Sequence, residues 1–146
     1  MKILILGISG MLGSCLYRYF INKKDFTIIG TLRNEEKKHL FDEGENSKIV
    51  TFSEYKNINK LDEFLSELNP DYVINCLGVI KQKMDSSSPE NSIFINSYFP
   101  HLLDKFSQKQ NFKIIHFSTD CVFDGNQGSY KETDIPLPRD FYGLSK

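Results

Sequence analysis

The last seven residues, "DFYGLSK", hold a tyrosine and a lysine whose spacing suits acid-base chemistry. Tyr142 and Lys146 are four positions apart, and on a helix this spacing puts both side chains on one face. An ammonium beside a phenol stabilises the phenolate, so the phenol releases its proton more readily. Such a tyrosine can donate a proton to a carbonyl oxygen while hydride arrives at the carbon. Because the same spacing also occurs in ordinary surface pairs, it needs support from the rest of the chain.

Two hydroxyl groups in "FSTDCVFDG" are candidate partners for this pair. Ser118 and Thr119 stand at the carboxyl end of a predicted strand, where ligands collect in open α/β sheets. A hydroxyl there can donate to a substrate oxygen and orient it. We prefer Thr119 to Ser118 for this role, and local capping of a turn is the alternative role for both.

A glycine-rich turn, "GISGMLG", follows the first apolar run of the chain. Gly7, Gly10 and Gly13 occupy a GxxGxxG spacing between a predicted strand and a predicted helix. Glycines at this junction let a pyrophosphate approach the backbone, and the free N–H groups of the helix attract its charge. A tight strand-to-helix turn without a ligand is the alternative. The place of the turn in an alternating α/β chain favours dinucleotide binding.

The residue twenty positions beyond the last of these glycines predicts which dinucleotide binds. An acid at about this distance would bind the ribose hydroxyl of NAD, but the chain has Arg33 there. A guanidinium suits a 2′-phosphate, so the sequence favours NADP, with NAD as the second choice. A solvated surface arginine, neutralised by the nearby Glu35 and Glu36, is the alternative.

The elements that must position these residues alternate between strands and helices. The apolar runs predict strands at residues 2–6, 26–32, 49–52, 72–77 and 113–118, with helical stretches at 12–20, 34–42, 58–68 and from 91 onward, and a first helical turn from 141. Residues 81–89 predict a polar surface loop, and Pro100 predicts a kink in the long helix. Right-handed crossovers then give an α/β fold of the Rossmann type. We expect a doubly wound parallel sheet in a three-layer sandwich, truncated after the fifth strand.

Apolar spacing also predicts which helix faces are buried. In the first helix the expected buried stripe consists of Leu12, Cys15, Leu16, Tyr19 and Phe20. In the long helix it consists of Phe94, Ile95, Tyr98, Phe99, Leu102, Leu103 and Phe106.

Length and composition limit the class of protein. The 146 residues are enough for one domain, predicted over residues 1–146. The net charge of -1 gives no argument for binding to nucleic acid or to an anionic membrane. Three widely spaced cysteines without metal-ligand spacing predict free thiols in the cytoplasm and no metal site.

Together the motifs resemble one enzyme family. "GISGMLG", "NCLGVIKQ", "INSYFPHLL", "STDCVFDG" and "YKETDIPLPRDFYGLSK" are similar to the extended short-chain dehydrogenase/reductases that act on nucleotide sugars, in the branch of dTDP-4-dehydrorhamnose reductase. The resemblance spans the whole chain. It implies a cytoplasmic oxidoreductase of deoxysugar and polysaccharide biosynthesis that moves hydride from NAD(P)H to a keto group on a nucleoside-diphosphate sugar.

The resemblance also implies roles for individual residues. Thr119 matches the catalytic hydroxyl and Tyr142 the proton donor, while Lys146 matches the residue that holds the nicotinamide ribose and favours the phenolate. The cofactor-binding positions implied are Gly7, Gly10, Met11, Leu12, Arg33, Cys76, Leu77, Gly78, Asn96, Ser118, Tyr142 and Lys146. Val122 and Phe123 match positions that line the sugar side.

Two departures from the family pattern shape the expectation. The third predicted strand lacks the Asp that usually lies near the adenine, so Phe52 and Ser53 are its expected substitutes. Family members are about twice as long, so we expect this chain to be an N-terminal piece that lacks the substrate-binding domain and turns over slowly or not at all.

Two other functions and one assembly question stay open at this point. The chain could instead belong to an NAD-dependent nucleotide-sugar epimerase of the same superfamily. It could also be a non-catalytic nucleotide-binding regulatory subunit, like that of methionine adenosyltransferase. A homo-oligomer is compatible with the sequence.

Overall fold

The structure is a computed structural model that describes residues 1–81 and 88–146. The described residues form two compact units, the first made of residues 1–77 and 102–116 and the second of residues 78–101 and 117–146. Most of the predicted loop at 81–89 lies outside the described residues. None of the described helices is long and apolar enough to cross a membrane.

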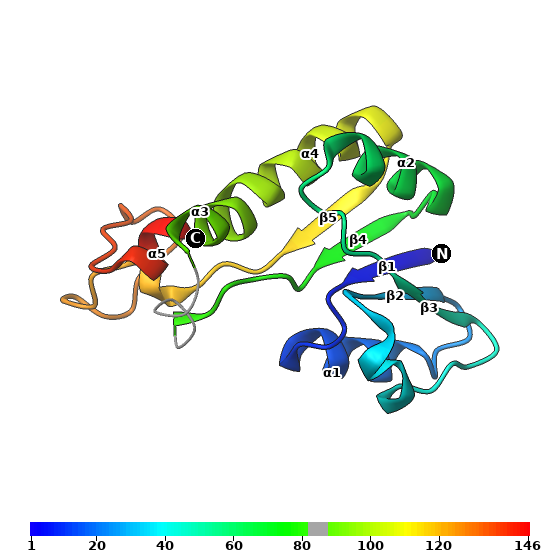
Figure 1. Ribbon diagram of the computed structural model, residues 1–146. Helices are drawn as coiled ribbons and strands as arrows, with labels where there is room; N and C mark the ends of the chain where they lie inside the picture. The colour runs from blue at the N-terminus through cyan, green and yellow to red at the C-terminus, as the bar shows by residue number, and fades with distance from the viewer. Residues whose placement is uncertain (82–87) are drawn as a thin grey trace. The chain divides into compact units, whose positions relative to one another are not determined.

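The first unit contains a parallel five-stranded sheet in the order β3-β2-β1-β4-β5 (Figure 1). The strands are β1 (Lys2–Leu6), β2 (Thr27–Leu32), β3 (Ser47–Thr51), β4 (Tyr72–Asn75) and β5 (Lys113–His116). All five lie where the apolar runs predict them, and the predicted Rossmann-type α/β fold is confirmed. The chain starts at the middle strand and changes direction after β3, so the carboxyl ends of β1 and β4 lie next to each other.

Helices cover both faces of this sheet (Figure 1). Helix α1 (Met11–Phe20) lies on one face, and α2 (Ile58–Leu68) and α4 (Phe99–Gln110) lie on the other. The central strand β1 is therefore covered twice, which explains why its sequence is apolar without alternation. The polar stretch after β2 forms a 3-10 helix, η1 (Glu35–Leu40), which buries none of its residues.

The buried face of α1 differs from the predicted stripe. Cys15 and Tyr19 are exposed, whereas Gly13 and Tyr17 are the buried residues of the helix. The reason is that Gly13 must pack against the carbonyl of Gly7, which rotates the helix and brings Tyr17, one turn later, onto the sheet. Apolar spacing alone could not show that a glycine sets the orientation of this helix.

The predicted long helix is present but contains a π-helical turn. It consists of α3 (Pro89–Ile93), η3 (Phe94–Tyr98) and α4. Within η3 the Phe99 N–H donates to the Phe94 carbonyl, five residues back. The turn directly precedes Pro100, which has no N–H to donate, so the proline is accommodated by a local change in helix pitch. The kink predicted at Pro100 stays a prediction, and the π turn before it was not foreseen from the sequence.

This extra residue in the turn changes which side chains of the second unit are buried. Tyr98, predicted to be buried, is exposed, and the polar residues Ser92 and Asn96 are buried instead. The second unit also contains a 3-10 turn, η4 (Asp120–Val122), and the terminal helix α5 (Phe141–Ser145). Helix α5 confirms the predicted helical turn from residue 141.

Candidate functional site

Two glycines of the first unit let the turn between β1 and α1 adopt its conformation. Gly7 has φ of +84°, which side chains rarely tolerate, and a Cβ on it would lie 2.6 Å from Leu77 Cδ2. A Cβ on Gly13 would overlap the carbonyl of Gly7. The two glycines therefore let the turn pack closely against Leu77 and let α1 pack closely against the Gly7 carbonyl. The predicted approach of a pyrophosphate to this turn stays a prediction.

The N–H groups of this turn divide into an occupied set and an open set. The N–H of Ile8 donates to the Thr31 carbonyl over 3.0 Å, and that of Gly10 donates to the Gly7 carbonyl over 3.1 Å. Gly10 is the N-cap residue of α1, and no side chain caps the helix. The first-turn amides, which include those of Met11 and Leu12, lack carbonyl partners within the helix.

This open helix start contrasts with that of three other α-helices, α2, α3 and α5. Side chains cap α2, α3 and α5, from Asn57, Ser88 and Asp140 respectively. Met11 at the start of α1 is 90% exposed. An uncapped N-terminus with a positive dipole end and a glycine turn in front of it suits a diphosphate group.

Arg33 follows β2 directly, and its side chain is exposed. Its guanidinium is close enough to Tyr55 to favour the ionised phenol, although burial has the larger effect and raises the pKa of Tyr55 overall. Arg33 is thus free to receive an anion at the end of β2.

Phe52 and Ser53, the residues expected near an adenine, have different surroundings. Phe52 stacks on Phe64 with ring centroids 4.1 Å apart and meets the edge of Tyr55 at 5.0 Å. Its ring is therefore part of internal packing. Ser53 is exposed.

The segment after β4 packs on the glycine turn. Asn75 is buried, and its Oδ1 accepts from the Leu77 N–H over 3.1 Å. This bond directs Leu77 onto Gly7. Cys76 is half-buried, and loss of water contact raises its pKa to about 11, so its thiol stays neutral at physiological pH. The predicted residues Cys76 and Leu77 therefore lie beside the glycine turn.

In the second unit, Thr119 is the N-cap residue of η4. Its Oγ1 accepts from the Cys121 N–H over 3.3 Å and donates to Asp120 Oδ1 over 3.2 Å. The local capping role foreseen for this hydroxyl is thus present. The neighbouring Ser118 is exposed.

The terminal pair is carried by α5, which begins at Asp140. The Asp140 carboxylate accepts from the Gly143 N–H over 2.8 Å and pairs with Lys81 Nζ at 2.5 Å. Both bonds lower the pKa of Asp140, the bond from Gly143 having the larger effect. Tyr142 in the first turn is partly buried, and its hydroxyl has no hydrogen-bond partner among residues 1–81 and 88–146.

Lys146 connects α5 to the segment that carries the candidate hydroxyls. Its Nζ donates to the Phe117 carbonyl over 2.7 Å, directly before Ser118 and Thr119. Partial burial lowers the pKa of Lys146. Gly143 of α5 also lies against the Cys121 carbonyl of η4. The structure therefore brings Thr119, Tyr142 and Lys146 onto two adjoining elements of one unit.

The buried side-chain amide of Asn96 supports this arrangement through hydrogen bonds. Asn96 Oδ1 accepts from the Val79 N–H over 2.8 Å, while its Nδ2 donates to the Val79 carbonyl and to Ser145 Oγ, both over 3.0 Å. Ser97 Oγ donates to the Ser145 carbonyl over 2.5 Å. Asn96 thereby ties α5 to the segment after β4, and a Cβ on Gly78 would meet Asn96 Oδ1 at 3.7 Å.

The predicted sugar-side residues lie beside a hollow of the second unit. Phe123 stacks on Tyr130 with centroids 4.4 Å apart, and the Tyr130 hydroxyl donates to Asp124. Phe123 and Tyr130 line a hollow together with Asp120, Gly125 and Ser129. Val122 ends η4 one residue earlier.

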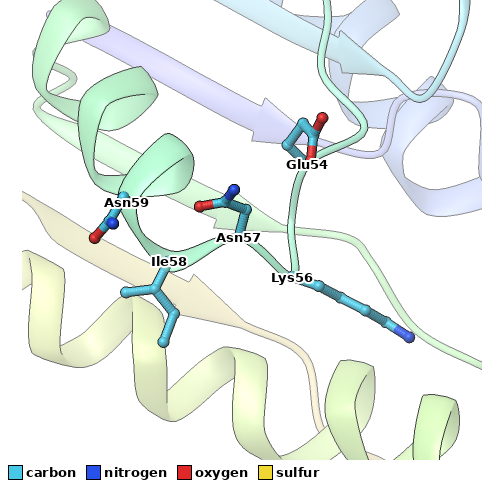
Figure 2. Close-up of a pocket in the computed structure, with 5 residues that line it drawn as sticks. All are labelled: Glu54, Lys56, Asn57, Ile58 and Asn59. Atoms are coloured by element: carbon cyan, nitrogen blue, oxygen red, sulfur yellow. The ribbon is translucent and has the colours of Figure 1, made fainter.

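Another surface hollow contains none of the predicted residues. It lies at the start of α2 and is lined by Glu54, Lys56, Asn57, Ile58 and Asn59 (Figure 2). The hollow lies at the capped first turn of α2, where Asn57 Oδ1 accepts a hydrogen bond from the Lys60 N–H. We assign it no role.

Sequence reasoning missed several polar residues that support the site. Thr31, Tyr55 and Asn75 are buried and hydrogen-bonded in the first unit, and Ser145 is buried and hydrogen-bonded in the second. Thr31 and Asn75 lie inside predicted strands, and Tyr55 follows a predicted strand. A polar residue in or beside an apolar run is the only sequence signal for them. Asp140 had a clearer signal, since an Asp directly before a helical turn is a typical N-cap.

The whole chain is similar to a known protein family. Residues 1–146 match the RmlD substrate binding domain. The chain belongs to this family. This confirms the resemblance to the nucleotide-sugar reductases that the motifs indicated.

Relatives of this RmlD-family chain include reductases and a subunit of methionine adenosyltransferase. It is 32% identical over 143 residues to a probable low-salt glycan biosynthesis reductase, Agl14, of Haloferax volcanii, covering 97% of the chain and 45% of the relative. It is 26% identical over 148 residues to a dTDP-4-dehydrorhamnose reductase of Aggregatibacter actinomycetemcomitans (99% and 44%). It is 27% identical over 150 residues to the methionine adenosyltransferase 2 subunit beta of Xenopus laevis (99% and 40%). The chain thus spans less than half the length of these relatives.

Solved structures agree on the fold. A hypothetical dTDP-4-dehydrorhamnose reductase from Sulfolobus tokodaii superposes with a TM-score of 0.77 at 30% identity, covering 99% of this chain and 49% of that one. The dTDP-4-dehydrorhamnose reductase of Bacillus anthracis in complex with NADP gives 0.76 at 24% (99% and 46%). The enzyme WbmG of Bordetella bronchiseptica in complex with NAD and UDP gives 0.82 at 18% (99% and 46%). The last two likenesses show the fold alone.

Proposed function

We propose that this chain carries the dinucleotide-binding and catalytic residues of a cytoplasmic reductase that converts a keto group on a nucleoside-diphosphate sugar into a hydroxyl. The observation that carries the proposal is the bond from Lys146 to the Phe117 carbonyl, which joins α5 to the Thr119 segment. It supports the proposal because it holds the helix that carries Tyr142 and Lys146 next to the segment that carries Thr119. The three free cysteines agree with a reducing compartment.

The first unit suits a nicotinamide dinucleotide, and NADP is the preferred form. The open amides of Met11 and Leu12 would hold its diphosphate, and the exposed Arg33 would meet a 2′-phosphate. The absence of side chains at Gly7 and Gly13 leaves room for this approach. Cys76 and Leu77 lie beside the turn and would lie along the cofactor.

The second unit suits the proton chemistry. When bound, NADPH supplies the hydride that adds to the carbonyl carbon. The Tyr142 hydroxyl gives its proton to the carbonyl oxygen, and solvent then returns a proton to the phenolate. Thr119 donates a hydrogen bond to the same oxygen, and Lys146 holds the nicotinamide ribose and stabilises the phenolate. The sum is one ketone, one hydride and one proton giving one alcohol.

Further residues complete the proposed site. Gly78 and Ser118 take part in cofactor binding, and Asn96 supports the catalytic helix through Ser145. Val122 and Phe123 line the sugar side. The hollow beside Phe123 supports this assignment.

One observation favours a second function. The similarity to the beta subunit of methionine adenosyltransferase 2 extends over 99% of this chain, so a non-catalytic regulatory role is the second candidate. The presence of Thr119, Tyr142 and Lys146 together favours chemistry, because nucleotide binding alone does not require this set.

The testing experiment measures both coenzyme and sugar. NADPH oxidation is followed at 340 nm with dTDP-4-keto sugars, using the longest coding sequence that contains this chain, while chromatography counts the sugar reduced. We expect one NADPH per sugar in the wild type. Tyr142→Phe should lower turnover by about 10²- to 10⁴-fold, a loss much larger than any change in NADPH affinity, whereas Tyr19→Phe, at an exposed position, should match the wild type.

Other results would distinguish a reductase from an epimerase and from a regulatory subunit. Sugar conversion without net NADPH consumption would identify an epimerase. NADPH binding without any sugar conversion, unaffected by Tyr142→Phe, would favour the regulatory role and refute the reductase.

A further inference from the structure

A buried hydrogen-bond chain behind the glycine turn is unexplained by the proposed chemistry. The Gly7 N–H donates to Thr31 Oγ1 over 2.9 Å, and Thr31 Oγ1 lies 3.1 Å from the Tyr55 hydroxyl. Thr31 is fully buried and Tyr55 is 7% exposed. Three segments far apart in the sequence therefore meet at one hydroxyl: the glycine turn, the end of β2 and the segment after β3.

This hydroxyl controls the direction of one amide. Gly7 is the residue with φ of +84°, so its N–H could point in several directions without a partner. Thr31 Oγ1 accepts that N–H and holds it toward the protein interior, while the Thr31 carbonyl accepts the next N–H, from Ile8. Together they fix two successive peptide planes that lead into α1.

Tyr55 in turn holds the Thr31 side chain. A threonine in a strand has more than one accessible χ1 rotamer, and only one directs its hydroxyl at Gly7. The bond to Tyr55 favours that rotamer. Tyr55 is itself held by the edge contact with Phe52, which stacks on Phe64 of α2.

The Thr31 hydroxyl can make both of these hydrogen bonds at the same time. Thr31 Oγ1 has two lone pairs and one proton, so it can accept from Gly7 and still bond Tyr55 as donor or acceptor. Burial raises the pKa of Tyr55, so its hydroxyl keeps its proton at physiological pH. An apolar residue at position 31 would leave the Gly7 N–H buried without its acceptor.

We propose that Thr31 and Tyr55 are positioning residues that hold the glycine turn ready for the dinucleotide diphosphate. The inference rests on the proposed function and adds two residues to it that touch no ligand. Without them the turn samples other peptide orientations, and binding must first select the competent one. The apparent affinity then falls by the fraction of the chain that is competent.

The experiment compares variants that remove only a hydroxyl. NADPH dissociation constants are measured by fluorescence titration for the wild type, Thr31→Val, Thr31→Ser and Tyr55→Phe, with the midpoint of thermal unfolding for each. We expect about tenfold weaker binding for Thr31→Val and about threefold for Tyr55→Phe, equivalent to the loss of one ordinary hydrogen bond or part of one. Thr31→Ser keeps the hydroxyl and should bind as the wild type does.

A matched control separates positioning from general stability. Tyr17 is a fully buried tyrosine of the same unit whose hydroxyl donates to the Asp42 carbonyl over 3.1 Å. Tyr17→Phe also removes one buried hydroxyl, but far along α1 from the turn. It should lower the unfolding midpoint while leaving the NADPH dissociation constant unchanged.

A second readout reports on the turn without any ligand. Exchange of the Gly7 amide proton with deuterium, followed by NMR, should accelerate in Thr31→Val and Tyr55→Phe and stay slow in Thr31→Ser and Tyr17→Phe. Faster exchange together with weaker binding supports the proposal.

The failing outcomes are distinct. If Thr31→Val and Tyr55→Phe bind NADPH as tightly as the wild type, or if Tyr17→Phe weakens binding equally, the positioning role is overturned. If the wild type itself binds no pyridine nucleotide, the proposed function fails first and the positioning role with it.

Discussion

At the scale of single residues, Arg33 decides the choice of coenzyme in the proposed function. Because it is exposed at the end of β2, a guanidinium bond to a 2′-phosphate would add affinity for NADPH only. Arg33→Ala should weaken NADPH binding by about 10- to 100-fold, the cost of a hydrogen bond to a charged group, and leave NADH binding unchanged. Fluorescence titration with both coenzymes measures this.

Arg18 provides the control for that substitution. It lies in α1, donates to the Leu40 carbonyl and covers the ring of Phe41. Arg18→Ala removes the same charge and should change neither affinity. Equal losses of NADPH and NADH affinity in Arg33→Ala would contradict a 2′-phosphate contact.

The thiol of Cys76 gives a prediction about pH. Burial raises its pKa from 9.0 to about 11. Since the folded-state pKa is raised, the thiol's contribution to stability is complete below pH 9 and is lost as the pH rises through about 11. Alkylation by iodoacetamide, which needs the thiolate, should therefore rise with a midpoint near 11 in a Cys15→Ser, Cys121→Ser background.

The corresponding stability measurement uses urea unfolding between pH 8 and pH 11. The free energy of unfolding of the wild type should fall more steeply with pH than that of Cys76→Ala. An alkylation midpoint near the ordinary thiol value would show that Cys76 is open to water, contrary to its position beside the glycine turn.

At the scale of elements, α5 depends on a polar anchor more than on apolar packing. It is five residues long and buries only Gly143 and Ser145, and a helix this short is not stable alone. Asn96 and Ser97 both supply tertiary bonds to Ser145 of this helix. This explains why a buried asparagine occupies a position that apolar spacing would assign to a hydrophobic residue.

Asn96→Ala should therefore loosen both ends of this anchor. The partly buried Val79 N–H and carbonyl would lose their partner, at a cost of about 1 kcal/mol each, the low end for unsatisfied groups. We expect the Val79 amide proton to exchange with deuterium at least about tenfold faster, since about 1.4 kcal/mol corresponds to that factor. NMR measures the rate.

Asn59→Ala is the control for the anchor. Asn59 is exposed at the start of α2 (Figure 2), and surface substitutions usually change stability by less than about 0.5 kcal/mol. Unchanged Val79 exchange in Asn96→Ala would mean that α5 is held by other contacts.

At the scale of the whole chain, ligand binding should be visible as stability. A ligand that binds only the folded state adds about 2.7 kcal/mol to the free energy of unfolding at 100 times its dissociation constant. NADPH at that excess should raise the midpoint of thermal unfolding of the 146-residue chain. Differential scanning calorimetry measures the shift.

Gly13→Ala tests whether this shift comes from the glycine turn. The added methyl group overlaps the Gly7 carbonyl, so the variant should be less stable by about 1–3 kcal/mol and should show no further stabilisation by NADPH. A wild-type-like shift in this variant would place the dinucleotide elsewhere.

Local sequence patterns were sufficient to predict the sheet and to nominate the candidate catalytic residues, whose roles stay predictions. Apolar runs predicted all five strands. The run is continuous in β1, because a strand covered on both faces has no polar side, whereas the edge strands β3 and β5 are partly exposed. The glycine spacing and the Tyr142, Lys146 and Thr119 motifs were local and could be recognised without a structure. The expectation that the chain is an N-terminal piece stays a prediction.

Tertiary structure alone decided orientation and support. Apolar periodicity was right for Leu16 and Phe20 of α1, which pack against the core, but wrong for Leu12, Cys15 and Tyr19, which are exposed. The close contact of Gly13 with Gly7 rotates the helix and buries Tyr17 instead. Apolar periodicity also missed the π turn before Pro100 and the burial of Asn96. Partners such as Thr31 and Tyr55 are 24 residues apart and meet only through the fold. A hydrogen bond between distant segments depends on three-dimensional position, which no local pattern of residue types encodes.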